Sequence, residues 1–322
     1  MQKVLELLKN DLAAVENQFR EDLASDVVLI RKVGEYVLGS GGKRVRPMLL
    51  LLSARLAGYQ GEKHIGLASV VEFIHTATLL HDDVVDGASL RRGNASANSV
   101  WGNEASVLVG DFLFAKSFSI MVRDGNLAIL KVLSDATTMM AEGEVQQLIS
   151  TCDLDLDEEQ YISVVRNKTA VLMAAACQCG AILAGIDSDR ELALREVGME
   201  LGIAFQFMDD ALDYVADQKE FGKRRGQDLA EGKMTLPLIH ALRQATAEER
   251  LRVEQIVELD ELDDAHIDEV VALIDRYDGI GYTRRRAAEL VASAKRRLEI
   301  FPPSREREAL CILADYVVGR TM

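Results

Sequence analysis

Apolar residues recur along most of the chain at intervals of three and four positions, which places them on one face of an α-helix. Segments in which apolar and polar residues alternate, as in half-buried β-strands, are nearly absent. Pro47 and Pro237 stand at predicted helix starts, and Pro302 and Pro303 separate the last two predicted helices. With no linker-like stretch and no solenoid-type repeat, the pattern predicts an all-α fold that forms a single domain over residues 1–322.

The same periodicity sets the expected helix boundaries. Helices are predicted at about residues 2–20, 26–38, 64–86, 103–124, 126–150 and 158–186, with another after a short polar turn and three or four more after Pro237. Thr169–Ile186 carries no charge and approaches the length of a membrane span. Because it is rich in Ala, Gly, Cys and Gln rather than Leu, Ile and Phe, a central helix packed on all sides is favoured and no transmembrane segment is expected.

Two acidic motifs of the form DDxxD follow apolar helical runs. The first contains Asp82 and Asp86, and the second contains Asp209 and Asp213. Residues four apart share a helix face, so each motif places two like charges together, which costs about 0.2–0.5 kcal/mol in an isolated helix. Magnesium removes such repulsion and typically combines one or two protein carboxylates with substrate phosphates. The duplicated motif therefore predicts magnesium ions and a polyanion held between two helices.

The overall charge restricts the partners of the protein. The formal net charge is −15, so most of the surface repels nucleic acid and anionic membranes, and no nucleic-acid partner is expected. The four cysteines form no CxxC pair and are interpreted as reduced thiols in a reducing compartment. The first residues lack the apolar core of a signal peptide, and a cytoplasmic location is expected.

Basic residues stand where they could bind a phosphate. Arg91 and Arg92 follow the first acidic motif, and arginine suits bidentate binding of phosphate. The glycine-rich turn Gly39–Gly42 allows close approach of the backbone to a ligand, and Lys43 and Arg46 follow it at a predicted helix start. In an acidic protein these basic residues indicate a local, concave anion site.

Taken together, five motifs, two of which overlap, resemble the trans-polyprenyl diphosphate synthase family, and within it the bacterial octaprenyl diphosphate synthases. They are the two DDxxD motifs, GGKRVRP at Gly41–Pro47, FIHTATLLHDDVVD at Phe73–Asp86, and GKMTLP at Gly232–Pro237. They occur in the family's order and extend over nearly the whole chain. The resemblance implies an isoprenoid-synthase-type helical bundle around a deep central cavity, a homodimer, and a product passed to a membrane enzyme for a quinone side chain.

The resemblance also implies roles for individual residues. For isopentenyl diphosphate, the nucleophilic substrate, it implies contacts from Lys43, Arg46, His75 and Arg92. For the allylic diphosphate it implies contacts from Arg91, Lys168, Thr169, Gln206, Lys223 and Lys233. The catalytic aspartates would be Asp82, Asp83, Asp86, Asp209, Asp210 and Asp213. Magnesium is assigned to Asp82, Asp86 and Asp209, with three ions expected when substrate is bound; Asp83 and Asp210 are expected to support these ligands, and Asp213 could do either.

The implied reaction is magnesium-dependent head-to-tail prenyl transfer, in which the double bond of isopentenyl diphosphate attacks an allylic carbocation. Ala77 and Thr78 lie five and four residues before Asp82, which places them roughly 6–7.5 Å below the metal-binding face. In short-chain members of the family a bulky aromatic residue here blocks the growing tail. The two small residues therefore favour a deep channel and a long product, about C40.

Three alternatives remain. A class I terpene cyclase is also helical and carries DDxxD, but it normally lacks GGKRVRP and a second full motif. A catalytically silent partner subunit is disfavoured because both acidic motifs are intact. A short-chain synthase giving C15–C20 products is the strongest alternative, and the small Ala77 argues against it.

Overall fold

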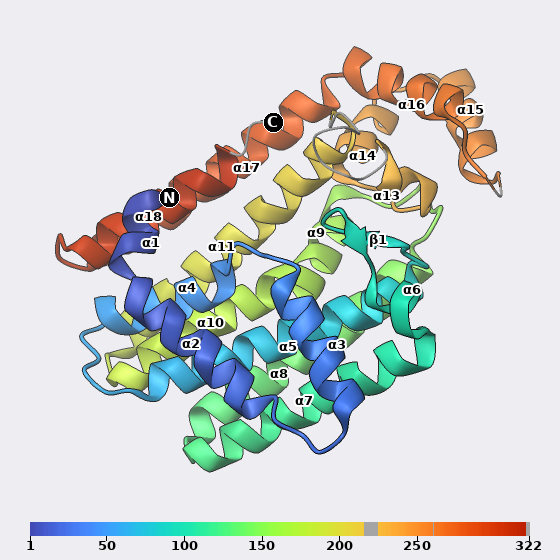
Figure 1. The fold of residues 1–322 in the computed structure, drawn as a ribbon. Coiled ribbons are helices and arrows are strands. Elements are labelled where there is room, and N and C mark those ends of the chain that lie inside the picture. Colours follow the sequence, from blue (N-terminus) through green and yellow to red (C-terminus); the bar gives the residue numbers. More distant parts are fainter. Residues whose placement is uncertain (216–224, 260, 320–322) are drawn as a thin grey trace. The chain divides into compact units, whose positions relative to one another are not determined.

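The computed structural model describes residues 1–215, 225–259 and 261–319, and these residues are mainly helical (Figure 1). Their one sheet is a hairpin of two short antiparallel strands, β1 (Leu90–Arg91) and β2 (Asn94–Ala95). In its register Leu90 pairs with Ala95 and Arg91 pairs with Asn94. The structure thus confirms the predicted all-α fold.

The chain divides into two compact units. Unit 1 comprises Met1–Thr137, Leu172–Gly198 and Arg297–Leu313, and unit 2 comprises Thr138–Val171, Met199–Arg296 and Ala314–Met322. That the whole chain forms a single domain stays a prediction.

The helices fall into three groups by the unit that holds their residues. Unit 1 contains α1 (Gln2–Leu7), α2 (Lys9–Asp22), α3 (Val28–Gly39), α4 (Val45–Leu56), α5 (Lys63–Val85), α6 (Ala97–Trp101), α7 (Asn103–Asp124) and the 3₁₀ turn η2 (Leu298–Ile300). Unit 2 contains α9 (Glu158–Val165), the π-helical turn η1 (Arg166–Ala170), α13 (Gln227–Ala230), α14 (Leu236–Leu242), α15 (Ala247–Val257) and α16 (Asp264–Arg276). Residues of both units occur in α8 (Leu127–Ile149), α10 (Val171–Ala184), α11 (Ser188–Asp213), α17 (Gly279–Arg297) and α18 (Arg305–Val318).

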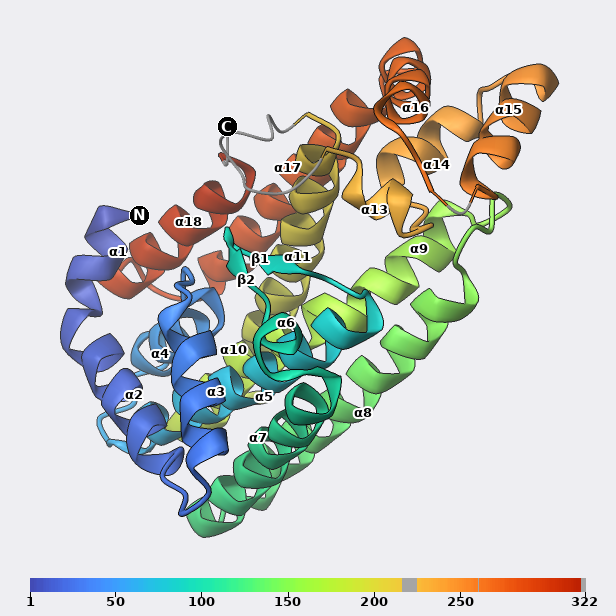
Figure 2. The same ribbon diagram turned by 45° about the vertical axis from the view of Figure 1, so that its right-hand side comes forward.

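Helix α5 lies at the centre of unit 1, where it packs against α2, α4 and α7 (Figures 1 and 2). It is buried along most of its length, and a helix that is apolar on nearly every side is stable only inside a core. Phe73 of α5 stacks on Phe19 of α2 with ring centroids 4.1 Å apart. The five residues Met48–Leu52 of α4 are completely buried as well. This core fixes the end of α5, where the first acidic motif begins.

Two predicted helices are interrupted in the structure. The expected helix at 2–20 is two helices, α1 and α2, which meet at the buried Leu8, whose ψ of 7° departs from helical geometry. Neither glycine nor proline marks this break in the sequence. The expected helix at 158–186 consists of α9, the π-turn η1 and α10, which ends at Ala184.

Two glycines in unit 2 make room for the π-turn. A Cβ atom added to Gly143 of α8 would lie 2.6 Å from the backbone nitrogen of Lys168. A Cβ atom added to Gly202 of α11 would lie 2.5 Å from the Cα of Ala170. Helices α8 and α11 therefore approach η1 more closely than any other residue at these positions would allow. Such π-turns occur frequently at functional sites.

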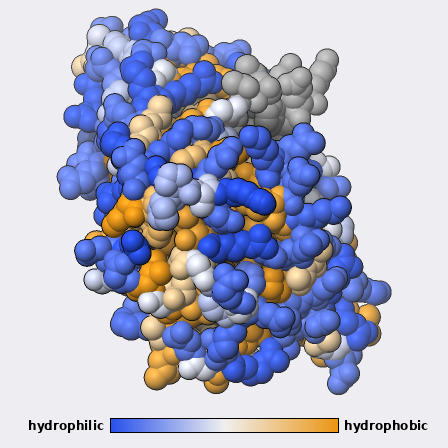
Figure 3. Space-filling view, turned by 90° about the vertical axis from the view of Figure 1, so that its left-hand side faces the viewer, coloured by the Kyte–Doolittle hydropathy of each residue, from blue (hydrophilic) through white to orange (hydrophobic). Residues whose placement is uncertain are grey.

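Among the described residues, two helical segments are long and apolar enough to cross a membrane by length and composition alone. They are Asn103–Asp124 and Glu158–Ala184, whose most apolar windows are 39% and 61% buried. Core helices of other proteins pass the same test, and α7 packs along α5 in unit 1. On the face in Figure 3, hydrophilic side chains predominate and hydrophobic ones form small groups between them. The expected absence of a transmembrane segment stays a prediction.

Candidate active site

The first acidic motif ends helix α5, and its carboxylates lie in two environments. Asp82 and Asp86 are partly exposed, and the Asp86 N–H donates to the Asp82 carbonyl oxygen at 2.8 Å. Asp83 is only 2% exposed, and the Arg91 guanidinium donates to its carboxylate with Nε and Oδ1 2.6 Å apart. Burial raises the pKa of Asp83, and the charge of Arg91 opposes the shift. The motif therefore presents two carboxylates outward and holds the third inside the protein.

Arginine side chains gather around His75 in unit 1. The Arg46 guanidinium donates to the ring of His75, with Nη1 and Nε2 3.1 Å apart, which places the ring proton on Nδ1. Burial lowers the pKa of His75 well below its usual range, and the positive charges of Arg46 and Arg92 lower it further. The Arg92 guanidinium lies against Gly42, where an added Cβ would be 2.8 Å from Nη1. The structure thus brings together three of the residues expected to bind isopentenyl diphosphate.

Arg44, within the same basic motif, has a different environment. It adopts a left-handed backbone conformation with φ of +51°, immediately before α4 begins. Its guanidinium forms an ion pair with Glu72 of α5, which is 7% exposed, and donates to the Leu38 carbonyl oxygen at 3.0 Å. Lys43, by contrast, is exposed in the preceding turn. Arg44 therefore holds the turn against α5, and its neighbours Lys43 and Arg46 are the candidates for an anion.

The second acidic motif ends helix α11 in unit 2 and repeats the arrangement of the first. Asp209 and Asp213 are partly exposed, and Asp210 is 2% exposed. Both oxygens of Asp210 accept hydrogen bonds, from the Tyr161 hydroxyl and from Gln206 Nε2 at 2.7 Å. Burial and the nearby charge of Asp228 raise the pKa of Asp210. In both motifs the second aspartate is thus occupied by protein donors.

A cavity of about 100 Å³ lies beside this motif, within unit 2. It is lined by residues of α8, α9, η1, α11, α13 and the segment between α13 and α14, among them Gln147, Tyr161, Lys168, Thr169, Gln206, Asp210, Asp228 and Lys233. Four of the residues expected to bind the allylic diphosphate therefore share one cavity: Lys168, Thr169, Gln206 and Lys233.

The two lysines of this cavity contact protein acceptors. Lys168 Nζ donates to Glu144 Oε2 at 2.6 Å and to Gln147 Oε1 at 2.7 Å. Lys233 Nζ donates to Glu231 Oε2 at 2.6 Å. An arriving diphosphate would compete with these carboxylates, and it offers more charge and more acceptor oxygens than a carboxylate does. Both ammonium groups are thus held near the cavity before any substrate binds.

The remaining expected residues are placed as follows. Lys223 lies outside the described residues. Ala77 is completely buried in α5, whereas Thr78 is partly exposed and its hydroxyl donates to the His75 carbonyl oxygen at 2.8 Å. Their role in setting product length stays a prediction.

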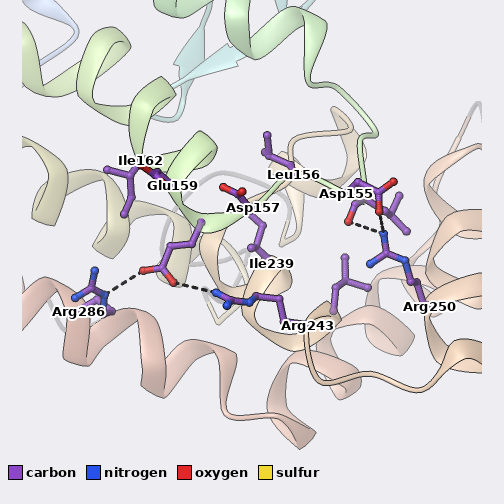
Figure 4. Close-up of a pocket in the computed structure, with 12 residues that line it drawn as sticks. Asp155, Leu156, Asp157, Glu159, Ile162, Ile239, Arg243, Arg250 and Arg286 are labelled. Carbon is purple, nitrogen blue, oxygen red and sulfur yellow. Dashed lines mark hydrogen bonds and ion pairs between the residues drawn. The ribbon is translucent and has the colours of Figure 1, made fainter.

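Unit 2 also contains a larger pocket, of about 520 Å³, with several ion pairs on its wall (Figure 4). Arg286 and Arg243 approach Glu158 at 3.1 and 3.7 Å, and Arg250 contacts Asp155 at 2.5 Å. Because its arginines are matched by carboxylates, this pocket lacks the excess positive charge that a diphosphate requires. Its pairs instead fix the start of α9, which carries Tyr161 to the smaller cavity.

Comparison with known proteins identifies the family. A sequence model described as polyprenyl synthetase matches residues 27–274. The chain belongs to the polyprenyl synthetase family. It is 45% identical to octaprenyl diphosphate synthase of Escherichia coli over 321 residues, which cover 99% of each chain. As a member of this family it is a prenyltransferase that elongates trans-prenyl chains, and the cyclase and short-chain alternatives are not favoured.

Solved structures give the same relationship. The polyprenyl synthase of Caulobacter crescentus, complexed with calcium and isoprenyl diphosphate, has a TM-score of 0.95 and 42% identity and covers 99% of this chain and 97% of its own. A decaprenyl diphosphate synthase of Rhodobacter capsulatus has the same TM-score and identity and covers 99% and 98%. These likenesses confirm the fold predicted from the polyprenyl synthase resemblance.

The donor set of this polyprenyl synthase suits magnesium. Within the described ranges, no three His, Cys, Asp or Glu side chains form a group that could hold a metal ion. Each motif instead offers two partly exposed carboxylates, Asp82 with Asp86 and Asp209 with Asp213. Magnesium usually binds one or two carboxylates and completes its shell with water and substrate phosphate, so the residues fit this ion.

Sequence reasoning missed several residues that shape the polyprenyl synthase site. Tyr161 holds Asp210 from 49 positions away, and Glu72 holds Arg44 from 28 positions away. Neither Tyr161 nor Glu72 belongs to a recognised motif. Gly143 does carry a sequence signal, because it is an isolated glycine within a helical pattern and such a glycine can have a packing reason. No periodicity signalled the π-turn, because the apolar pattern continues across it.

Proposed function

We propose that this prenyltransferase is a long-chain trans-polyprenyl diphosphate synthase. It adds isopentenyl diphosphate units in succession to an allylic diphosphate such as farnesyl diphosphate and forms a product of about C40. The observation that carries the proposal is the pattern shared by both acidic motifs, in which the first and last aspartates are partly exposed and the middle one is buried. Two such outward carboxylate pairs suit the binding of a magnesium diphosphate.

The cavity of unit 2 binds the allylic diphosphate in this proposal. Lys168 and Lys233 supply positive charge where the leaving diphosphate gains negative charge, which favours breaking of the carbon–oxygen bond. Thr169 and Gln206 orient the group, and Lys223 completes the set by its place in the sequence. Arg91 contacts the same diphosphate in this proposal, and its hydrogen bond to Asp83 holds it beside the first motif.

The basic cluster of unit 1 binds isopentenyl diphosphate. Arg46, Arg92 and Lys43 attract its diphosphate, and arginine favours this group geometrically as well as by charge. His75 stays neutral because its pKa is lowered, so it offers an Nδ1–H donor without adding to the charge of the cluster. The bound double bond then attacks the allylic carbon, and the released diphosphate can accept the proton that is lost.

Asp82, Asp86 and Asp209 would hold magnesium, with three ions expected when substrate is bound. When bound, magnesium neutralises the allylic diphosphate and assists its departure as a Lewis acid. The protein orients these carboxylates toward the magnesium site, and it holds the buried aspartates beside them in place.

The wider assignment extends the resemblance to known members of the family. The enzyme acts as a cytoplasmic homodimer without a transmembrane segment or a nucleic-acid partner. Its product passes to a membrane enzyme and provides a quinone side chain, as in ubiquinone biosynthesis.

The proposal is tested by incubating the enzyme with farnesyl diphosphate, labelled isopentenyl diphosphate and magnesium. Chromatography of the dephosphorylated products should show one main prenol near eight isoprene units, and a chelator should abolish its formation. Products that stop at three or four units would leave prenyl transfer intact but reject the long-chain assignment. Cyclised hydrocarbon formed from farnesyl diphosphate alone would reject the proposal.

A further inference from the structure

Tyr161 has no part in the reaction as proposed above, yet it is built into the second acidic motif. Its side chain is 5% exposed, and its ring stacks on Phe207 of α11 with centroids 5.8 Å apart. Its hydroxyl donates to Oδ2 of Asp210. Burial, together with the charge of Asp210, raises the pKa of Tyr161 well above its usual value, so the hydroxyl keeps its proton and remains a donor.

The contact continues as a chain of hydrogen bonds toward the allylic cavity. Gln206 Nε2 donates to Oδ1 of Asp210 at 2.7 Å, and the Thr169 hydroxyl donates to Oε1 of the same amide at 3.0 Å. An amide has a donor end and an acceptor end, so fixing one end fixes the other. Tyr161 occupies one oxygen of Asp210 and leaves the other aimed at Gln206. The orientation of the Gln206 amide therefore depends on Tyr161.

The helix that carries Tyr161 is firmly anchored. Asp157 and Gln160 form a capping box at the start of α9, in which each side chain bonds the other's backbone N–H at 2.8–2.9 Å. Glu158 accepts from the Tyr282 hydroxyl at 2.7 Å and from Arg286 Nε at 3.1 Å, both on α17. Tyr161 is thus carried by a helix whose start is held in place by several hydrogen bonds.

We propose that Tyr161 is a positioning residue for the allylic substrate: by holding Asp210, it keeps the Gln206 amide turned so that its oxygen accepts from Thr169 and its second Nε2–H is left for the diphosphate. Without the tyrosine hydroxyl, Asp210 turns toward other donors and the Gln206 amide can rotate. Its carbonyl oxygen would then face the anion. The inference rests on the proposed allylic site, and isopentenyl diphosphate should be unaffected because its residues belong to unit 1.

The test uses Tyr161→Phe, which keeps the stacked ring and removes only the hydroxyl. Binding of a non-reactive thiolo analogue of farnesyl diphosphate is measured by calorimetry with magnesium present. Because the misoriented Gln206 amide would lose its hydrogen bond to the anionic diphosphate, the Kd of the analogue should rise about 10- to 100-fold while the KM of isopentenyl diphosphate stays within about twofold. Tyr277→Phe is the matched control, because that hydroxyl also donates to a carboxylate, on Glu249 at 2.8 Å, but outside the cavity.

A double-mutant cycle separates positioning from general damage. In an Asp210→Ala background, Tyr161→Phe should weaken the analogue by less than about twofold, because the hydroxyl no longer has its target. An unchanged Kd in the single variant, an equal loss for both substrates, or a full additional loss in the Asp210→Ala background would overturn the inference.

Two further variants keep the result interpretable. If Tyr161→Phe fails to fold, Gln206→Met replaces it: methionine keeps a side chain of similar shape and removes the amide through which Tyr161 acts, so an unchanged Kd would overturn the inference. Lys168→Ala tests the allylic site itself. Lost affinity there, with none lost in Tyr161→Phe, rejects the role of Tyr161 alone, whereas full affinity in Lys168→Ala rejects both proposals.

Discussion

Asp83 and Asp210 hold the second position of their motifs, and each is buried and bound by donors from its own unit. A buried carboxylate without partners would be costly, so Arg91 on one side and Tyr161 with Gln206 on the other are needed for stability. Their neighbours at the first and last positions stay partly exposed. The spacing DDxxD thus places the buried second aspartate of each motif next to the two partly exposed aspartates.

The lowered pKa of His75 makes the stability of the enzyme depend on pH. Below about pH 6.5 the unfolded chain protonates this histidine whereas the folded enzyme does not, so stability falls as the pH decreases toward the folded pKa. The loss should be detectable at pH 5.5, which lies below the pKa of the unfolded histidine. His75→Gln should remove it, so denaturant unfolding at pH 8 and 5.5 should show a smaller decrease in the variant. An identical decrease in both proteins would contradict a neutral His75.

At the scale of elements, the π-turn η1 joins α9 to α10 and carries Lys168 and Thr169. A wide turn places residues where a regular helix would not, and it fits here because Gly143 and Gly202 leave space beside it. The position of the allylic ligands therefore depends on two residues that would not touch the substrate.

Gly143→Ala should disturb this turn. The added methyl group would lie 2.6 Å from the Lys168 backbone nitrogen, and overpacking of this kind typically costs about 1–3 kcal/mol. Steady-state kinetics should show a several-fold rise in KM for the allylic substrate, with little change for isopentenyl diphosphate. Gly66→Ala in α5 is the control, because a Cβ there meets nothing within 4 Å. Equal kinetics in the two variants would show that η1 tolerates the shift.

Helix α5 carries the predicted determinant of product length. Ala77→Tyr should shorten the product, because the aromatic ring would block a tail passing beneath Asp82. Ala77 is completely buried, so thermal unfolding must show that the variant is folded. Ala68→Tyr, at another completely buried alanine of α5, should destabilise the protein without shortening the product. Chromatography of dephosphorylated prenols measures both, and an unchanged length in folded Ala77→Tyr would reject the channel assignment.

At the scale of the whole molecule, the sequence predicted most helices and both acidic motifs, but it did not predict contacts between residues that are far apart in the chain. The 3.6-residue periodicity predicted helices such as α3, α5 and α7, because burial follows the apolar face. The break at Leu8 and the π-turn were not predicted, since packing rather than glycine or proline produces them. The motifs identified the candidate ligands, but the contact between Tyr161 and Asp210 joins residues 49 positions apart and required the folded structure.

The acidic character of the chain also acts at this scale. With a net charge of −15, the protein repels anions in general, so its diphosphate substrates need local clusters of positive charge. Unit 1 supplies one cluster around His75 and unit 2 supplies another at Lys168 and Lys233. We propose that the nucleophilic substrate binds at the first cluster and the allylic substrate at the second.

The assignment of the two substrates to separate clusters is tested most directly by measuring KM for both substrates in two variants, Arg46→Gln and Lys168→Gln. Each removes one positive charge and leaves a shorter, uncharged polar side chain. The account predicts that Arg46→Gln raises KM for isopentenyl diphosphate by about tenfold or more and leaves the allylic KM nearly unchanged, and that Lys168→Gln does the reverse. Variants that raised both KM values equally, or in the opposite sense, would contradict it.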